Sequence, residues 1–350
     1  MTAPFAGPLR ELALHMGFPS ALAARGNSRP YCDRREFIAA IGSTVVWPYG
    51  ARAQQQEAKP RIGVLGLTPP TYTTFEAFKQ GLGQFNHPDN LIERNAAGIQ
   101  ERLPELAAEL VQLKTDVIFA RGPAALAVAK NATSIIPIVA VDLESDPVAL
   151  GLVKSLARPE GNITGVFLDL PELCGKQVEL LKEIFPQITR IAIIGDPVLN
   201  ATQFRATEIA AQAFAIRSEK LEIRAEADFE IAFDAAKRGH AEAIIILSSP
   251  LIYGHRARLA ALGLSKRLPV ISLFAELAQE GGFLAYGPSL VESFQRCGRY
   301  VDRILRGAKP GELPIERPER FQLVINFKTA KILELIVPPI LLARADEVIE

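Results

Sequence analysis

The sequence has few of the residues that build disulfide frameworks and metal centres. Its 350 residues include three cysteines and four histidines. No His-Glu-x-x-His or Cys-x-x-Cys pattern occurs, so the common zinc-site motifs are absent. A Gly-x-Ser-x-Gly nucleophile elbow and a Gly-x-x-x-x-Gly-Lys phosphate loop are missing as well. The easily recognised enzyme classes are therefore excluded, and we expect no catalytic residue, no metal and no cofactor.

Neither sign of charge is in excess. The chain has 39 basic and 39 acidic residues, of which six basic and three acidic lie in residues 1–53, so residues 54–350 carry 33 against 36. This balance gives no basic surface for nucleic acid or an anionic membrane. Beyond residue 53 no run reaches the 18 or so apolar residues of a membrane span. We expect no nucleic-acid partner and no stable membrane insertion.

Residues 33–56, "DRREFIAAIGSTVVWPYGARAQQQ", have the parts of an export signal. Arg34 and Arg35 are a paired positive charge. Phe37–Tyr49 is an uncharged stretch with the length of a signal h-region, too short to span a bilayer. The small-x-small pattern that ends at Ala53 predicts cleavage after that residue. The adjacent arginines resemble a twin-arginine signal, and a buried helix is the alternative. The true translation start stays open.

Two cysteines, Cys174 and Cys297, remain after the predicted cleavage. Two cysteines cannot form a disulfide framework, although one bridge is compatible with an oxidising compartment. We favour two small buried residues that are not bridged, and leave the single disulfide as the alternative.

The chain contains an approximate copy of itself. Short Ile- and Val-rich runs alternate with alanine-rich amphipathic segments, which is typical of an α/β fold with a mostly parallel sheet. "RIGVLGLTPP" at 61–70 is echoed by "RIAIIGDP" at 190–197, and the strand patterns at 116–141 recur at 242–273. Pro137 and Pro269 are each expected at the first position of the second strand of their copy, where a missing N–H is tolerated. We therefore predict two similar, doubly wound parallel-sheet lobes.

The order of the segments also predicts how the two lobes are divided. The stretch "EGNITG", around residues 160–165, interrupts the strand and helix rhythm and indicates a first hinge. A long helix from about residue 289 to 306 follows the last repeated strand. We predict one lobe of residues 58–163 and 288–318 and a second of residues 164–287 and 319–350, joined by a three-strand hinge.

Ligands of parallel α/β sheets bind beyond the carboxyl ends of the strands, so loops at these ends supply the candidate site. One wall is predicted at 67–71, 121–123 and 141–146, and the other at 195–200, 248–250 and 272–274. The candidate ligand-binding residues are Thr68, Thr71, Arg121, Gly122, Asp142, Phe167, Asp196, Ser248, Phe274 and Tyr286.

Each residue type suits a part of a small ligand, and each has a structural alternative. The hydroxyls of Thr68, Thr71 and Ser248 suit a carboxylate or cap helices. Arg121 faces an anionic ligand or pairs with a local acid. Asp142, Glu144 and Asp146 form an acidic cluster, in which Asp142 suits a ligand ammonium group. The aromatic residues form apolar pocket walls or belong to the core.

Several stretches resemble the substrate-binding proteins of ABC importers, whose fold is the type I periplasmic binding protein fold. These are "DVIFARGPAALAVAKNATSIIPIV", "DPVALGLVKSLARPEGNITG", "HRARLAALGLSKRLPVI", "GGFLAYGPSL" and "GRYVDRILRGAKPGELPIERPERFQLVINFKTAK". The resemblance implies a periplasmic, monomeric receptor that binds a small solute, such as an amino acid or another small carboxylate. Its implied partners are an ABC permease and ATPase subunits.

The sequence departs from the family pattern in two places, and two other functions stay open. Residues 84–102 are shorter than usual, and "ARGP" at 120–123 replaces a hydroxyl-bearing loop, which places Arg121 there. The alternatives to a transport receptor are a ligand-sensing receptor without a transporter and an α/β enzyme on the same scaffold.

Overall fold

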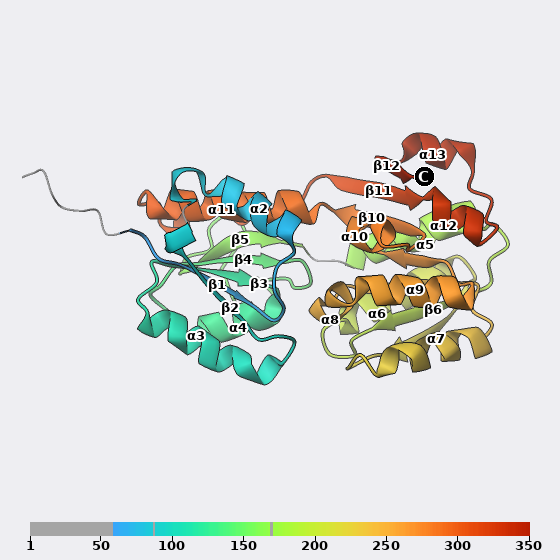
Figure 1. Ribbon diagram of the computed structural model, residues 1–350, viewed down its shortest axis with the longest axis horizontal. Coiled ribbons are helices and arrows are strands. Elements are labelled where there is room, and N and C mark those ends of the chain that lie inside the picture. The colour runs from blue at the N-terminus through green and yellow to red at the C-terminus, as the bar shows by residue number, and fades with distance from the viewer. Residues whose placement is uncertain (1–58, 87, 169–170) are drawn as a thin grey trace, which may run out of the picture. The chain divides into compact units, whose positions relative to one another are not determined.

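The computed structural model describes residues 59–86, 88–168 and 171–350 (Figure 1). The predicted export signal and its cleavage site after Ala53 lie outside the described residues. Lys59–Glu350 forms one compact unit that contains two β-sheets.

The first sheet consists of five parallel strands in the order β2-β1-β3-β4-β5. The strands are β1 (Ile62–Gly66), β2 (Leu91–Asn95), β3 (Val117–Arg121), β4 (Ile138–Asp142) and β5 (Ile163–Phe167). Helices α2 (Tyr72–Gly81) and α11 (Leu290–Leu305) cover one face, and α3 (Leu103–Gln112) and α4 (Pro123–Ala132) cover the other. Both faces are covered, which explains why the central strands are continuous apolar runs.

The second sheet has seven strands in the order β12-β11-β10-β9-β8-β6-β7. They are β6 (Arg190–Gly195), β7 (Arg217–Glu222), β8 (Ala243–Ile246), β9 (Val270–Ser272), β10 (Leu284–Pro288), β11 (Phe321–Asn326) and β12 (Glu347–Ile349). All neighbouring pairs are parallel except β10 and β11.

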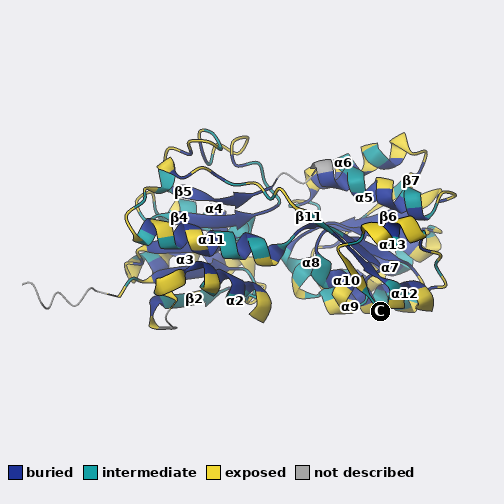
Figure 2. Cartoon of the chain, turned by 90° about the horizontal axis from the view of Figure 1, so that it is seen from above, coloured by how far each residue is buried: buried dark blue, intermediate teal, exposed yellow. Residues whose placement is uncertain are grey.

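Helices cover both faces of the second sheet as well. One face packs against α5 (Pro171–Ile184), α6 (Ala201–Ala213), α12 (Phe327–Ile332) and α13 (Pro339–Arg344). The other packs against α7 (Asp228–Arg238), α8 (Pro250–Gly254), α9 (Arg256–Lys266) and α10 (Ala275–Gln279). Short 3-10 helices are η1 (Gly83–Phe85), η2 (Pro88–Asn90), η3 (Gln100–Arg102) and η4 (Pro310–Glu312). Figure 2 shows central strands of both sheets buried between helices whose outer faces are exposed.

The predicted α/β class with two parallel-sheet lobes is confirmed. The order β2-β1-β3-β4-β5 in the first sheet matches β7-β6-β8-β9-β10 in the second. The repeated stretches of the sequence are β1 and β6, then β3 and β8, then β4 and β9. Pro137 and Pro269 lie directly before β4 and β9, outside the strands, where the missing N–H of proline costs no ladder hydrogen bond.

The division between the sheets differs from the expectation at "EGNITG". Ile163 begins strand β5, which pairs with β4 in the first sheet, so the expected boundary after residue 163 and the expected hinge fall within a sheet strand. Gly165 has φ +139°, and a side chain there would clash with the backbone oxygen of Ala140. The glycine therefore serves close strand pairing rather than a hinge.

The chain passes between the two sets of elements three times. The connections are the segment after β5, the junction of β10 with α11 at Pro288–Ser289, and the segment from Arg306 to Arg320 that leads to β11. Cys174 lies on α5 and Cys297 on α11, both are buried, and no disulfide joins them.

Helix α11 lies between β10 and β11 of the second sheet in the sequence but packs tightly on α2 of the first lobe. A Cβ on Gly298 would lie 2.8 Å from the Cα of Gly81 and would clash with the backbone oxygen of Phe78. The ring of Phe78 stacks on Phe119 of β3 with centroids 4.2 Å apart, and Phe294 of α11 meets Phe119 edge-on at 5.5 Å. The backbones of the two helices therefore approach closely only because both contact positions are glycine.

We predict that Gly298→Ala lowers the free energy of unfolding by about 1–3 kcal/mol, because the added methyl group forces α2 and α11 apart. Urea denaturation measures the change. Gly175→Ala in α5 is the matched control, because nothing lies within 4 Å of its Cβ position. Alanine is a better helix former than glycine, so the control is neutral or stabilising by up to about 1 kcal/mol. Equal effects of the two substitutions would refute the close-packing argument.

Candidate functional site

A pocket lies where loops at the carboxyl ends of strands from both sheets meet helices α2, α8 and α11. Its empty space is about 610 Å³ with the open mouth included. The first sheet contributes the loops that follow β1, β3 and β4. The second contributes Ser248–Pro250 and Tyr253, together with Phe274 after β9. A smaller adjoining cavity shares Ser248, Ser249, Tyr253 and Phe274 with this pocket.

Six of the ten candidate residues lie together in the lining of this pocket: Thr68, Thr71, Arg121, Gly122, Ser248 and Phe274. The other four, Asp142, Phe167, Asp196 and Tyr286, are not part of the lining. Asp142 directly precedes the lining residues Leu143 and Glu144 in the sequence.

Two of the aromatic candidates belong to packed surfaces of the sheets. Phe167 is 1 % exposed and packs in the hydrophobic core on the α3 and α4 side of the first sheet. Tyr286 lies in the middle of β10, with its ring 6.1 Å from that of Phe321 on the neighbouring strand. Aromatic residues on strands fit the pleated surface well, which explains why both residues contribute to packing.

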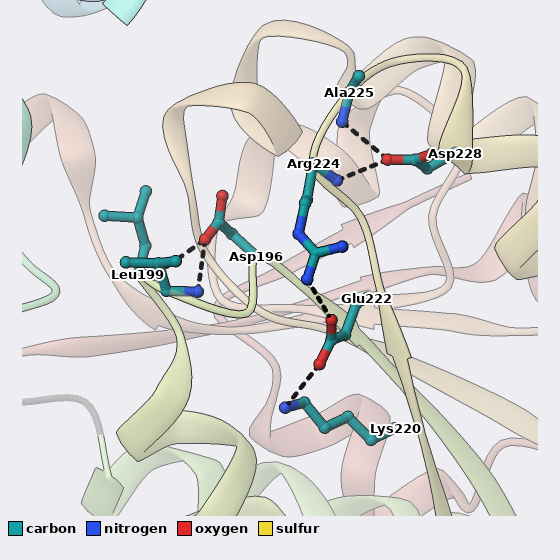
Figure 3. A network of polar contacts seen from close by, with 8 residues as sticks. Asp196, Leu199, Lys220, Glu222, Arg224, Ala225 and Asp228 are labelled. Atoms are coloured by element: carbon teal, nitrogen blue, oxygen red, sulfur yellow. Dashed lines mark hydrogen bonds and ion pairs between the residues drawn. The ribbon is translucent and has the colours of Figure 1, made fainter.

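Asp196 stabilises the turn after β6. One carboxylate oxygen accepts hydrogen bonds from the backbone N–H groups of Val198 and Leu199, at 2.8 and 2.9 Å (Figure 3). Figure 3 also shows the neighbouring chain of ion pairs from Lys220 through Glu222 to Arg224. The Asx-type turn accounts for an aspartate at this position without a ligand.

The hydroxyl groups divide between capping and the pocket. Thr71 is the N-cap of α2 and accepts a hydrogen bond from the backbone N–H of Thr74. Ser249 caps α8 through the N–H of Ile252, so Ser248 has no capping role there. The Ser248 hydroxyl instead donates to Oε1 of Glu144, at 3.1 Å. This bond joins the loop after β8 in the second sheet to the loop after β4 in the first.

Arg121 ends β3, and its guanidinium lies against the end of β1. A Cβ on Gly66 would lie 2.5 Å from Cζ of Arg121, so only glycine leaves room for the guanidinium at that position. Nη2 donates to the backbone oxygen of Thr68, while the buried Nε has no partner among the described residues. Burial lowers the pKa of Arg121 to about 10, so the group stays positively charged at neutral pH.

Two carboxyl groups lie near the arginine on the neighbouring strand end. Asp142 is 1 % exposed; its Oδ1 accepts the backbone N–H of Glu144 at 3.1 Å, and its Oδ2 has no hydrogen-bond partner among the described residues. Glu144 lines the pocket. Burial raises the pKa of both carboxyl groups, that of Glu144 to about 8, and the negative charge of Asp142 adds to the effect on Glu144. No ion pair joins Arg121 to either group among the described residues.

The apolar part of the pocket is largely formed by residues outside the candidate set. Tyr253 meets Phe274 edge-on, with ring centroids 6.2 Å apart, and its buried hydroxyl lies near the Thr71 side chain without a well-formed hydrogen bond to any described residue. Leu290 and Phe294 come from the first turns of α11. The sequence predicted a helix from about residue 289 in the first lobe, but not that its first turns would line the pocket.

The described residues contain no group of three or more histidine, cysteine, aspartate or glutamate side chains placed to hold a metal ion. Among the described helices, none combines the length and apolar character needed to cross a bilayer.

Comparison with known proteins identifies the family of this chain. Residues 68–349 match the family model described as ABC transporter substrate binding protein. The chain belongs to this family. The resemblance found in the sequence is thereby confirmed for the family and for the fold.

The individual proteins that are similar to this chain are distant from it in sequence. A tyrosine-binding protein of Clostridioides difficile (strain R20291) is 24% identical over 246 residues, which are 69% of this chain and 70% of that protein. The crystal structure of a Streptococcus pneumonia ABC domain in complex with L-Trp is 22% identical, with a TM-score of 0.76 over 83% of this chain and 100% of that one. A conserved domain protein of Vibrio cholerae is 24% identical, with a TM-score of 0.75 and the same coverage.

We predict that Tyr253→Phe raises the free energy of unfolding of the ligand-free protein by about 1 kcal/mol, because a buried hydroxyl without a partner is costly. Chemical denaturation measures the change. Tyr300→Phe is the matched control: the Tyr300 hydroxyl lies 2.5 Å from the oxygen of Pro314 and 3.0 Å from Glu316, so its loss destabilises by about 1–2 kcal/mol. Destabilisation by both substitutions would show that the Tyr253 hydroxyl has a partner in the empty pocket.

Proposed function

We propose that this protein is the solute receptor of an ABC importer and binds a small amino acid with an apolar or aromatic side chain, which it delivers without chemical change. The observation that carries this proposal is the separation of charges in the pocket. Arg121 and the carboxyl pair of Asp142 and Glu144 follow neighbouring strands without pairing with each other. A zwitterion satisfies both sides at once.

The spacing of the strands fits the two charges of an amino acid. Arg121 is in register with Val141, the residue before Asp142, and neighbouring strands lie about 4.8 Å apart. In the proposed complex the ligand carboxylate binds Arg121 and the first turns of α2 and α4, near Thr68, Thr71 and Gly122. Helix N-termini favour anions through their N–H groups and their dipole. The ligand ammonium group faces Asp142 and Glu144.

The rings of Tyr253, Phe274 and Phe294 supply a wall for the ligand side chain. Aromatic surfaces of this kind favour flat apolar groups. Two relatives support the choice of ligand class, because one is named a tyrosine-binding protein and the other was solved with L-Trp. Phe167, Asp196 and Tyr286 have no place in the proposed ligand contacts.

Delivery depends on contacts from both lobes. A ligand bound to the first lobe adds contacts with Ser248, Tyr253 and Phe274 of the second, so it favours the arrangement in which the lobes are close. The three connections between the lobes allow such a movement while they keep the halves in register. A permease with its ATPase subunits would recognise that arrangement of a monomeric receptor.

We also propose that residues 1–53 direct export to the periplasm through the twin-arginine-type signal. The measurement is N-terminal sequencing of the protein recovered from the periplasm, with Gln54 expected as the first residue. Recovery in the cytoplasm with the leader intact would contradict the proposed location.

The ligand is tested by thermal unfolding with a panel of amino acids, small carboxylates and sugars. A ligand present at about 100 times its Kd stabilises the folded state by about 2.7 kcal/mol, which raises the midpoint by several degrees. We expect apolar and aromatic L-amino acids to give the largest increases. A panel in which only sugars stabilise the protein would contradict the proposed ligand class.

Arg121→Gln is predicted to weaken binding of the best amino acid roughly ten- to hundredfold, because a hydrogen-bonded pair with a charged group contributes about 1.5–3 kcal/mol. Titration calorimetry measures the loss. Arg344→Gln is the control, because Arg344 forms an exposed ion pair with Glu183 on α5, at 2.7 Å, and does not line the pocket. Unchanged affinity of Arg121→Gln would remove Arg121 from the site.

A further inference from the structure

Two carboxyl groups, those of Asp142 and Glu144, form the acid side of the pocket. One of them would be enough to balance the charge of a ligand ammonium group. The Oδ2 atom of Asp142 is buried and has no hydrogen-bond partner among the described residues. Glu144 follows two residues later and presents its carboxyl group to the pocket, where one oxygen accepts the Ser248 hydroxyl at 3.1 Å. Neither carboxyl group forms an ion pair with a described cation.

The groups around the pair do not neutralise two negative charges. From β3, the Arg121 guanidinium is held by the Thr68 oxygen over Gly66. From α8, Tyr253 is neutral, since burial raises its pKa to about 12. Behind Tyr253 on α10, Glu276 is a further buried acid whose pKa burial raises.

Two further charged groups lie outside the pocket lining: Arg256 of α9 lies over the Tyr253 ring and pairs with Glu280 at 3.4 Å, and Glu93 of β2 acts on Arg121. The rest of the pocket lining carries no charge. Helix α2 contributes hydroxyl groups of Thr71 and Thr74, and α11 contributes the apolar side chains of Leu290 and Phe294. Two carboxylates in one buried site repel each other, and the pair lowers its energy if it keeps a proton. The hydrogen bond from Ser248 leaves the second oxygen of Glu144 available to carry that proton.

We propose that Asp142 and Glu144 hold one proton between them in the empty pocket and release it to the solvent when the ammonium group of the ligand binds. This inference rests on the proposed function, since it concerns the same pocket and the same ligand class. It adds that capture of the ligand is coupled to proton release, and it makes Glu144 the residue responsible.

Charge balance explains why the proton leaves. The empty pair carries one negative charge and one proton. A bound ammonium group supplies one positive charge and several N–H donors, which favours ionisation of both carboxyl groups. The pair then carries two negative charges and the ammonium one positive charge, so the net charge on the acid side of the pocket is the same before and after binding. The bond that breaks is the O–H bond of the protonated carboxyl group, and its proton passes to the solvent.

The coupling fixes the direction of the pH dependence. The ligand binds the fully ionised pair, and in the empty pocket Glu144 ionises only as the pH approaches its pKa of about 8. Affinity therefore rises with pH, roughly tenfold per unit between pH 6 and 7, and becomes level above about pH 8. A ligand captured at neutral pH is therefore released more readily at a lower pH.

The test is titration calorimetry of the wild-type protein with L-tryptophan and L-tyrosine at pH 7, in phosphate, HEPES and Tris buffers. The slope of the observed enthalpy against the ionisation enthalpy of the buffer gives the number of protons released. We expect a value close to one for the wild type and close to zero for Glu144→Gln. Glu160→Gln, an exposed residue paired with Lys154, is the control and should release the same number as the wild type.

A second ligand makes the test independent of how well Glu144→Gln folds. Indole-3-propionate keeps the ring and the carboxylate of tryptophan but has no amino group. The wild-type protein should bind it without proton release and with an affinity that does not rise between pH 6 and 7. Amino acids that bind with no proton released would overturn the inference and leave the proposed function intact. Failure of every amino acid to bind would overturn both.

Discussion

The pocket depends on the parallel register of β1, β3 and β4. Because parallel strands point the same way, their carboxyl ends meet at one edge of the sheet and bring residues from distant parts of the sequence together. Gly66 pairs with Arg121, and Arg121 pairs with Val141. The glycine leaves the space in which the guanidinium lies, and the residues after Val141 place the acid pair beside it. A shift of one residue in either pairing would separate these groups.

The same register also brings opposite charges into one pocket without pairing them with each other. The Arg121 guanidinium is directed to a backbone oxygen, and the two carboxyl groups are directed to a backbone N–H and to Ser248. Buried charges without partners lower the stability of the folded state, so such an arrangement is costly in the empty protein. A zwitterionic ligand would relieve this cost, and binding to both lobes would follow from the same contacts.

Much of the fold could be predicted from the sequence because it depends on local patterns that occur twice. The Ile- and Val-rich runs of β1, β3 and β4 recur as β6, β8 and β9, and repetition distinguishes them from isolated buried strands. The role of "EGNITG" could not be predicted, since a glycine that permits close strand pairing looks the same in sequence as one at a hinge. The long helix α11 was predictable, but its Gly298 contact with α2 joins positions more than 200 residues apart.

Only the site residues that lie at or just after the ends of strands could be predicted from the sequence. Arg121 ends β3, Gly122 follows it, and Ser248 lies two residues after β8; all three line the pocket. Asp142 was chosen over Glu144, although Glu144 lines the pocket and Asp142 is 1 % exposed and not part of the lining, because the geometry of the loop after β4 decides between them. The aromatic candidates on strands could not be separated from core residues, whereas Tyr253 on a short helix lines the pocket.

The most direct test of this account is a crystal structure of the protein with its tightest-binding solute. The account predicts a zwitterion in the pocket, with its carboxylate on Arg121, its ammonium group between Asp142 and Glu144, and contacts from Ser248 and Tyr253 of the other lobe. A solute held elsewhere, or one held by a single lobe without these charged residues, would contradict it.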